Sequence, residues 1–280
     1  MRTLKTVEIC RFPSGSGHRG VIMKLDYKNK KWDKHFTNIK KVIKDLKGEL
    51  TGAININTSY KNLIENKEPT KQNYYRYLKS CQRNYASDAG TCYVLDNGDY
   101  KAVDYTYLSG ITGVLASELM GEALEDGNMD LQEAIYELIA TDQTQVSYLR
   151  DEKELISCIF NQNYEKAKEL LDNIQADEEV IEGSYYEAVP ALKNIYMAII
   201  EKNERAFNEE LQKRIKRYRR NAVGYTTEID YISVALIKMA KKAGINYTFD
   251  VIEIPGSFFD ESYEINKEFK LPIPKMGSVP

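Results

Sequence analysis

The sequence predicts a predominantly all-α protein, built as an irregular antiparallel bundle or stack of helical hairpins. From residue 105 onward, apolar residues recur in one segment after another at the spacing of amphipathic helices. Helix-capping residues and glycines separate these segments. Because no repeat consensus recurs at a fixed period, we expect an irregular stack and not a regular solenoid.

Three regions are expected: an N-terminal segment of residues 1–70 packed on the main body, an all-helical domain of residues 71–263, and an extended proline-rich tail of residues 264–280. In the first region, "VEICRF" and "VIMKLDY" predict minor strands around a loop, and residues 31–48 predict a helix. The three prolines of the tail forbid regular structure there.

Residues 71–87 predict the first helix of the main body. Its apolar face consists of Tyr74, Tyr77, Leu78, Cys81 and Tyr85. The run "TCYVLDNGDYKAVDY" then places Asn97 and Gly98 between two β-prone stretches, which predicts a small β-hairpin near residues 92–103. The competing interpretation is that a helix ends at Gly98.

Apolar stripes predict helices along the rest of the main body. The stripe of the first of these consists of Leu108, Ile111, Leu115, Leu119 and Ala123. Residues 131–139 predict the next helix, and residues 152–174 predict a helix, a tight turn and a second helix.

Capping residues mark the ends of two later helices. Ser184 and Glu187 form a capping box ahead of one. Thr227 and Asp230 are expected to cap the start of the last helix, and Gly244 is expected to end it as a C′ glycine.

The stretch "QKRIKRYRR", residues 212–220, concentrates six basic residues, and its register predicts an amphipathic helix before a nucleic-acid contact. The expected buried stripe is Phe207, Leu211, Ile215 and Tyr218. Glu209 with Lys213, and Glu210 with Arg214, form favourable pairs four residues apart, so a structural role accounts for most of the charge. The basic residues in excess, for which phosphate binding stays open, are Lys216, Arg217, Arg219 and Arg220. The acidic total argues against general nucleic-acid affinity.

Composition excludes several classes of protein. A chain of 280 residues is long enough for a large core. The four cysteines form no C-x-x-C pair, so neither a zinc site nor a disulfide framework is indicated. No apolar run approaches the roughly 20 residues of a membrane span, and charge interrupts the start of the chain before a signal-peptide core forms. We therefore expect a cytoplasmic protein without a membrane partner.

The net charge of −3 is unevenly distributed along the chain. Residues 1–101 hold twenty Lys and Arg against ten Asp and Glu, whereas residues 102–149 hold nine acidic residues and no Lys or Arg. We call these nine the acidic belt: Asp104, Glu118, Glu122, Glu125, Asp126, Asp130, Glu133, Glu137 and Asp142. Either folding brings basic segments onto the acidic belt, or the belt faces a partner.

The sequence predicts no catalytic constellation. Both histidines lie in the N-terminal segment, and the loop "SGSGHRG" lacks the spacing of a phosphate-binding loop. Glu118 with Glu122, and Glu133 with Glu137, place carboxylates on one helix face, but no histidine follows a Glu by three residues as in di-metal bundles. We therefore expect a protein with no catalytic, cofactor or metal site, whose paired glutamates form a solvated face.

The C-terminal half resembles a known family over about residues 105–260. The segment "ALKNIYMAIIEKNERAFNEELQKRIKRYRR" is followed by "ISVALIKMAKKAGI" and "VIEIPGSFF", and preceded by "IATDQTQVSYLRD". This order is similar to that of the immunity-protein-49 family of bacterial polymorphic toxin systems. The matching positions are Phe207, Asn208, Leu211, Ala235, Ala240, Gly244 and Pro255. Tyr218 stands where the family pattern leads us to expect a histidine.

The resemblance implies a non-enzymatic, all-α cytoplasmic protein that binds and neutralises a cognate secreted toxin in the producing bacterial cell. If that toxin is a nuclease, an acidic surface would mimic its substrate and speed association. The first candidates for the toxin contact are Glu118, Glu122, Glu125, Asp126, Glu133 and Glu137. The second candidates form an acidic connector of Asp177, Glu178, Glu179 and Glu182.

Two other functions stay open. Paired helices also fit a helical-repeat regulator that binds peptides. The abundant carboxylates fit, less well, a nucleotide- or metal-dependent hydrolase.

Overall fold

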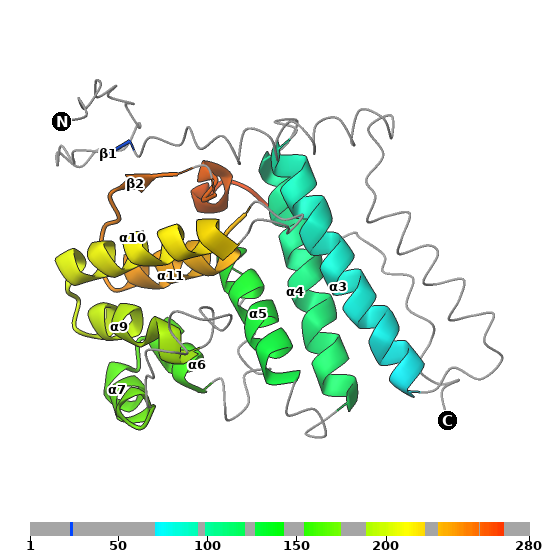
Figure 1. Ribbon diagram of the computed structural model, residues 1–280, viewed down its shortest axis with the longest axis horizontal. Helices are drawn as coiled ribbons and strands as arrows, with labels where there is room; N and C mark the ends of the chain where they lie inside the picture. The colour runs from blue at the N-terminus through cyan, green and yellow to red at the C-terminus, as the bar shows by residue number, and fades with distance from the viewer. Residues whose placement is uncertain are drawn as a thin grey trace.

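The computed structural model describes residues 23–24, 71–94, 99–120, 127–142, 154–174, 189–221, 229–251 and 253–265. Over these ranges the predicted all-α class is confirmed (Figure 1). The helices are α3 (Lys71–Val94), α4 (Asp99–Met120), α5 (Gly127–Ala140), α6 (Glu154–Phe160), α7 (Tyr164–Asp172), α9 (Val189–Ile200), α10 (Glu204–Asn221), α11 (Tyr231–Lys242) and the short 3₁₀ helix η4 (Gly256–Phe259). The two-residue strands β1 (Met23–Lys24) and β2 (Phe249–Asp250) pair in parallel, and β1 lies within the predicted strand "VIMKLDY".

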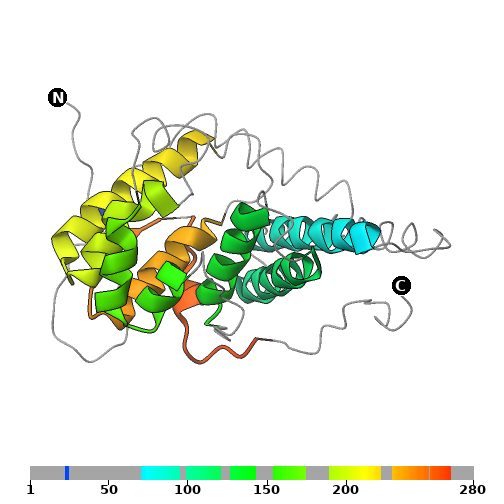
Figure 2. The same ribbon diagram turned by 90° about the horizontal axis from the view of Figure 1, so that it is seen from below.

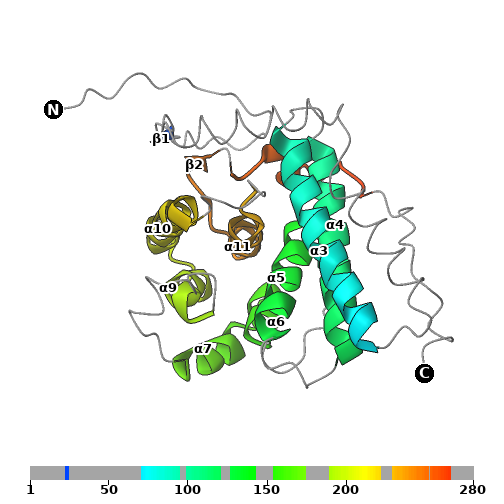
Figure 3. The same cartoon turned by 45° about the vertical axis from the view of Figure 1, so that its right-hand side comes forward.

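The helices form two groups that meet at α11. In the first group α3 and α4 run side by side, as Figure 2 shows from below, and α5 packs on α4. The second group contains the pairs α6 with α7 and α9 with α10. Figure 3 shows α11 between the groups, and it contacts α5, α6, α9 and α10.

Helix α11 is buried on all sides. Every residue from Ile232 to Ala240 is buried, which is typical of a helix inside a core and not of a surface helix. Asp230 caps its start, because the carboxylate accepts the backbone N–H of Ser233 at 3.0 Å. The predicted C′ glycine is confirmed: Gly244 has a φ of +86° and donates its N–H to the carbonyl of Lys241.

Two helical hairpins, α6 with α7 and α9 with α10, are built alike. Their turns are residues 161–163 and 201–203, and the middle residue of each has a positive φ, 61° at Gln162 and 51° at Lys202. The asparagine that follows donates its N–H to a carbonyl of the preceding helix at 2.8 Å in both turns. Buried positions correspond at a fixed offset of 40 in residue number, in the pairs Leu155 and Ile195, Ile159 and Ile199, Ala167 and Phe207, and Leu171 and Leu211. The helix-turn-helix predicted over residues 152–174 is therefore confirmed, and it is used twice.

The predicted β-hairpin near residues 92–103 is wrong. The described residues on both of its sides are helical, since α3 continues to Val94 and α4 begins at Asp99. The β-prone side chains Cys92 and Val103 are instead buried in the helical core, so tertiary packing overrides their local preference. The turn itself, Asn97-Gly98, lies outside the described residues.

Other predictions for local structure fall outside the described residues. These are the strand "VEICRF", the helix over residues 31–48, the capping box of Ser184 and Glu187, the cap at Thr227, and the tail beyond residue 265.

The buried face of α4 differs from the predicted stripe. Leu108 is buried, but Ile111 and Leu115 are only half-buried. The face that packs on α3 and α5 is lined instead by small residues: Ser109, Gly110, Thr112, Gly113 and Ala116. A Cβ atom on Gly113 would lie 2.5 Å from Gln82 Nε2 and 2.7 Å from Ala134 Cβ, so this position requires glycine for the close approach of its neighbours.

The replacement Gly113→Ala tests this packing. We expect it to lower the free energy of unfolding by about 1–3 kcal/mol, because the new methyl group overpacks the contact with α3 and α5. Urea unfolding measures the change. The matched control is Gly256→Ala, where an added Cβ meets no atom within 4 Å, and an equal loss in both variants would contradict the explanation.

Candidate functional site

Four polar side chains meet between α3, α4 and α5, and we call them the interior acid cluster: Lys79, Gln82, Ser109 and Glu137. Glu137 is only 1% exposed. The Ser109 hydroxyl oxygen lies 2.8 Å from Glu137 Oε1 and 2.8 Å from the backbone oxygen of Gln82. Lys79 Nζ donates to Gln82 Oε1. Burial raises the pKa of Glu137 well above its usual value and Glu133 raises it further, whereas the other members of the cluster act in the opposite direction.

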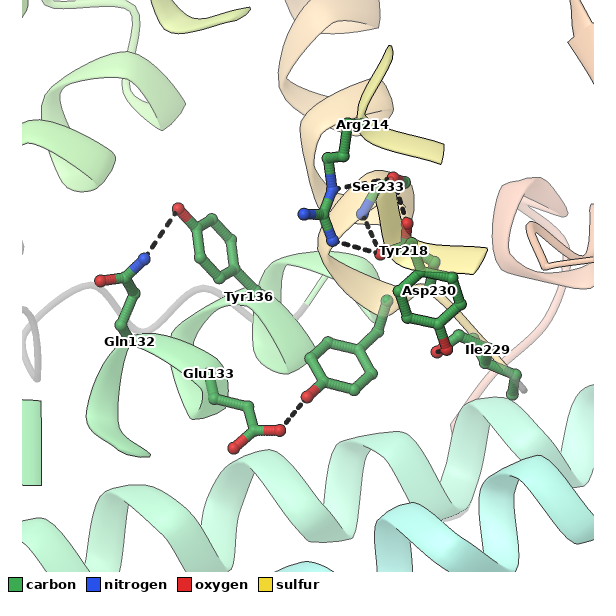
Figure 4. A network of polar contacts seen from close by, with 9 residues as sticks. Gln132, Glu133, Tyr136, Arg214, Tyr218, Ile229, Asp230 and Ser233 are labelled. Carbon is green, nitrogen blue, oxygen red and sulfur yellow. Dashed lines mark hydrogen bonds and ion pairs between the residues drawn. The ribbon is translucent and has the colours of Figure 1, made fainter. Parts of the chain in front are cut away.

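A second set of polar contacts joins α5 to α9 and α11. The Tyr231 hydroxyl donates to the half-buried carboxylate of Glu133, and Gln132 Nε2 donates to the hydroxyl of Tyr136 (Figure 4). The Tyr136 hydroxyl also contacts that of Tyr196. These contacts place α5 at the centre of the polar interior.

Arg214 forms a buried ion pair across the junction of α10 and α11 (Figure 4). Its side chain is the largest of those that are fully buried. Nη2 donates to Asp230 Oδ1 at 2.6 Å and Nε donates to Ser233 Oγ at 3.1 Å. The backbone N–H of Asp230 donates in turn to the carbonyl of Glu253 at 2.9 Å. One carboxylate thus caps α11 and neutralises the buried guanidinium.

The ion pairs predicted within α10 are wrong. Glu210 accepts from Lys213 at 2.6 Å and not from Arg214, and Glu209 accepts from Arg205 at 2.9 Å. Arg214 turns inward because it follows Leu211 by three residues and therefore lies beside the apolar stripe. That register was the signal available in the sequence. The stripe itself, Phe207, Leu211, Ile215 and Tyr218, is buried as predicted.

Four members of the acidic belt have described side chains, and all four make contacts within the fold. Asp142 pairs with Lys238 of α11, whose pKa is lowered by burial, and Asp104 accepts a hydrogen bond from Tyr263. Glu133 contacts Tyr231, and Glu137 lies in the interior acid cluster. Asp142 is paired with a basic side chain, as the first of the two alternatives expects. The contacts described for the other three come from hydroxyl groups.

Two of the predicted toxin-contact residues therefore change role. Glu137 is buried, so a partner could not contact it. The prediction that Glu133 and Glu137 form a solvated face is therefore wrong. Glu133 is half-buried beneath Tyr231. The side chains of the other candidates lie outside the described ones: Glu118, Glu122, Glu125, Asp126, Asp177, Glu178, Glu179 and Glu182.

The described cysteines are buried thiols. Burial raises the pKa of Cys81 and of Cys92 to about 11, and it also raises the pKa of Cys158. A thiol with a raised pKa is a poor nucleophile and a poor metal ligand, because the thiolate is the reactive form. Among the described residues, no group of three or more His, Cys, Asp or Glu side chains is placed to hold a metal ion.

The residues that carry the family resemblance hold the framework. Phe207 and Leu211 are fully buried. Tyr218, which departs from the family pattern, donates its hydroxyl to the carbonyl of Ile229 at 3.1 Å. The side chain of Asn208 holds the segment after α11 in place, in what we call the Asn208 clamp. Its Nδ2 donates to the carbonyl of Asn246 at 2.9 Å, and its Oδ1 accepts the backbone N–H of Thr248 at 2.9 Å. These positions thus specify packing and a loop attachment.

No protein-family model matches this chain, and comparisons with curated proteins and with solved structures found no match either. The resemblance to the immunity-protein-49 family therefore stays a prediction from the order of the sequence motifs. In the part of the chain that is described, no helix is both long enough and apolar enough to span a bilayer.

The variant Asp230→Ala tests the buried ion pair. We expect the free energy of unfolding to fall by about 3–5 kcal/mol, because the buried Arg214 charge would lose the Asp230 carboxylate. Urea unfolding measures the loss. Glu209→Ala, which breaks the exposed pair with Arg205, is the control and should leave the unfolding midpoint nearly unchanged. Similar midpoints for both variants would argue against a structural role for the pair.

Thiol alkylation tests the burial of the cysteines. Treatment of the native protein with iodoacetamide should leave Cys81, Cys92 and Cys158 unmodified, and modification should appear only in urea. Mass spectrometry of the peptides reads each site separately. Rapid labelling of any of the three in the native state would contradict the expected protection.

Proposed function

We propose that this chain is an immunity protein, a non-enzymatic helical protein that binds and neutralises a cognate toxin domain in the cytoplasm of the producing bacterium. The resemblance of residues 105–260 to the immunity-protein-49 family supports this proposal. The buried stripe of α10, the clamp made by Asn208 and the glycine end of α11 are consistent with it, since these features give the matched motif residues distinct structural roles.

One observation carries the proposal: among the described residues, side chains that could take part in catalysis are instead buried or bonded to other groups of the fold. Ser109 bonds within the interior acid cluster, Arg214 is neutralised by Asp230, and the described thiols are buried. A partner would then meet polar and charged side chains carried on packed helices. Charge complementarity of this kind gives a protein interface its specificity and its rapid association.

We assign the toxin contact to the part of the acidic belt at the end of α4 and in the residues that follow it. The four belt members with described side chains make contacts within the fold, so the candidates that remain in the first set are Glu118, Glu122, Glu125 and Asp126. The acidic connector of Asp177, Glu178, Glu179 and Glu182 remains the second choice. A toxin that is basic where it binds nucleic acid would be complementary to either surface.

Co-expression tests the function directly. The toxin-like terminal domain of a large secreted protein encoded beside this gene is expressed in a bacterial host with and without this chain. The proposal expects growth to be restored and the two proteins to purify as a complex. Failure to rescue the cells from that domain would refute it.

Charge reversal then tests the contact surface. The double variant Glu122→Lys, Glu125→Lys should weaken binding by at least about tenfold and reduce rescue, because like charges across an interface cost several kcal/mol. The control is Glu165→Lys, Glu169→Lys, which reverses two exposed glutamates on α7. Equal rescue by both variants would remove the acidic belt from the interface.

A helical-repeat regulator is the second candidate, and the duplicated hairpin favours it. Hairpins of one design that stack on each other are the unit of peptide-binding repeat proteins. Affinity for short peptides in a binding screen, together with no rescue in the co-expression assay, would favour this function over immunity.

A further inference from the structure

The hydrogen atoms of the interior acid cluster can be counted. The Ser109 hydroxyl carries one hydrogen, yet its oxygen lies 2.8 Å from two acceptors, the carbonyl of Gln82 and Oε1 of Glu137. A backbone carbonyl oxygen can only accept. If the one hydroxyl hydrogen were shared between these two acceptors, both hydrogen bonds would be bent and therefore weak. Both contacts are good hydrogen bonds if Ser109 donates to Gln82 and Glu137 donates to Ser109.

The groups around Glu137 fit a carboxyl group that keeps its proton. The second oxygen, Oε2, is buried and has no hydrogen-bond partner, which is costly for a carboxylate and much less so for a neutral acid. Glu133 stands one turn away on α5 with Tyr231 of α11 donating to it, so a second negative charge at Glu137 would be repelled. From α3, both the Lys79 amine and the Gln82 side chain favour ionisation, and the Lys79 amine donates to Gln82.

We propose that Glu137 is a neutral carboxylic acid in the folded protein, that it donates a hydrogen bond to Ser109, and that its ionisation loosens the packing of α5 on the hairpin of α3 and α4. The interior acid cluster is then a proton-binding site that couples pH to the docking of these helices. Small residues on α4 keep the three helices close, so a charged carboxylate has little room to gain water there.

The direction of the pH dependence follows from the raised pKa of Glu137. The unfolded chain returns this carboxyl to its usual pKa of 4.5. The stabilisation is fully present below that pH and is lost as the pH rises toward the folded-state pKa. Within that window one proton separates the folded and unfolded states, so the unfolding equilibrium constant rises about tenfold per pH unit.

Infrared spectroscopy of the full-length protein at neutral pH is the direct test. We expect the carbonyl band of a protonated carboxylic acid in the wild type and its loss in Glu137→Gln, which keeps the shape of the side chain and stays neutral. If Glu137→Gln does not fold, ¹³C NMR of glutamate-labelled wild type provides the test, since one buried side-chain carboxyl should titrate well above the others. A spectrum with only ionised glutamates at neutral pH would overturn the proposal.

Unfolding in urea at several pH values tests the coupling. Glu137→Gln should lose the tenfold-per-unit component of the pH dependence, whereas Glu165→Gln, the same change on the exposed face of α7, should retain it. Hydrogen exchange of α3 and α4 amides should accelerate with pH beyond the intrinsic rate in the wild type and not in Glu137→Gln. The same pH dependence in wild type and Glu137→Gln would refute the switch.

Discussion

The burial of α11 on every side is the constraint from which much of the polar interior follows. The first backbone N–H groups of a helix lack partners within it, and a buried start cannot rely on water. Asp230 supplies the cap, but this brings a carboxylate into the core, and Arg214 is recruited from α10 to balance it. Further along, the amine of Lys238 is matched by Asp142 at the end of α5. One enclosed helix thus fixes charged partners from distant parts of the chain.

Some charged residues of this protein hold the fold, and under the proposed function others would contact a partner. Part of the acidic belt is used by the fold: Glu137 is buried, and the exposed Asp142 pairs with the buried Lys238. The proposed toxin contact is assigned to other belt members, at the end of α4 and in the residues after it. Ion pairs at an enclosed helix end are coupled to folding, whereas charges on the outside can change at small cost to stability.

Regular apolar spacing predicted most helices of the main body, because side chains such as Phe207, Leu211 and Ile215 are both strongly apolar and truly buried. The same signal failed on α4, where glycine and small hydroxyl residues form the contact face, and in residues 92–103, where β-prone side chains pack in a helical core. The buried roles of Arg214 and Glu137 were missed for a related reason. A charged residue is assigned to solvent by default. Its burial is stable only when a distant segment supplies a polar partner, here Asp230 for Arg214 and Ser109 for Glu137.

The small-residue face of α4 also has a consequence for the order in which the chain assembles. Glycine lowers intrinsic helix stability by about 1 kcal/mol per residue relative to alanine, and Gly110 and Gly113 stand within one turn of each other beside Ser109 and Thr112. As an isolated segment α4 would spend little time helical. Its helix forms when α3 and α5 close around it, so this part of the molecule acquires secondary and tertiary structure in one cooperative event, after the hairpins rich in local contacts have formed.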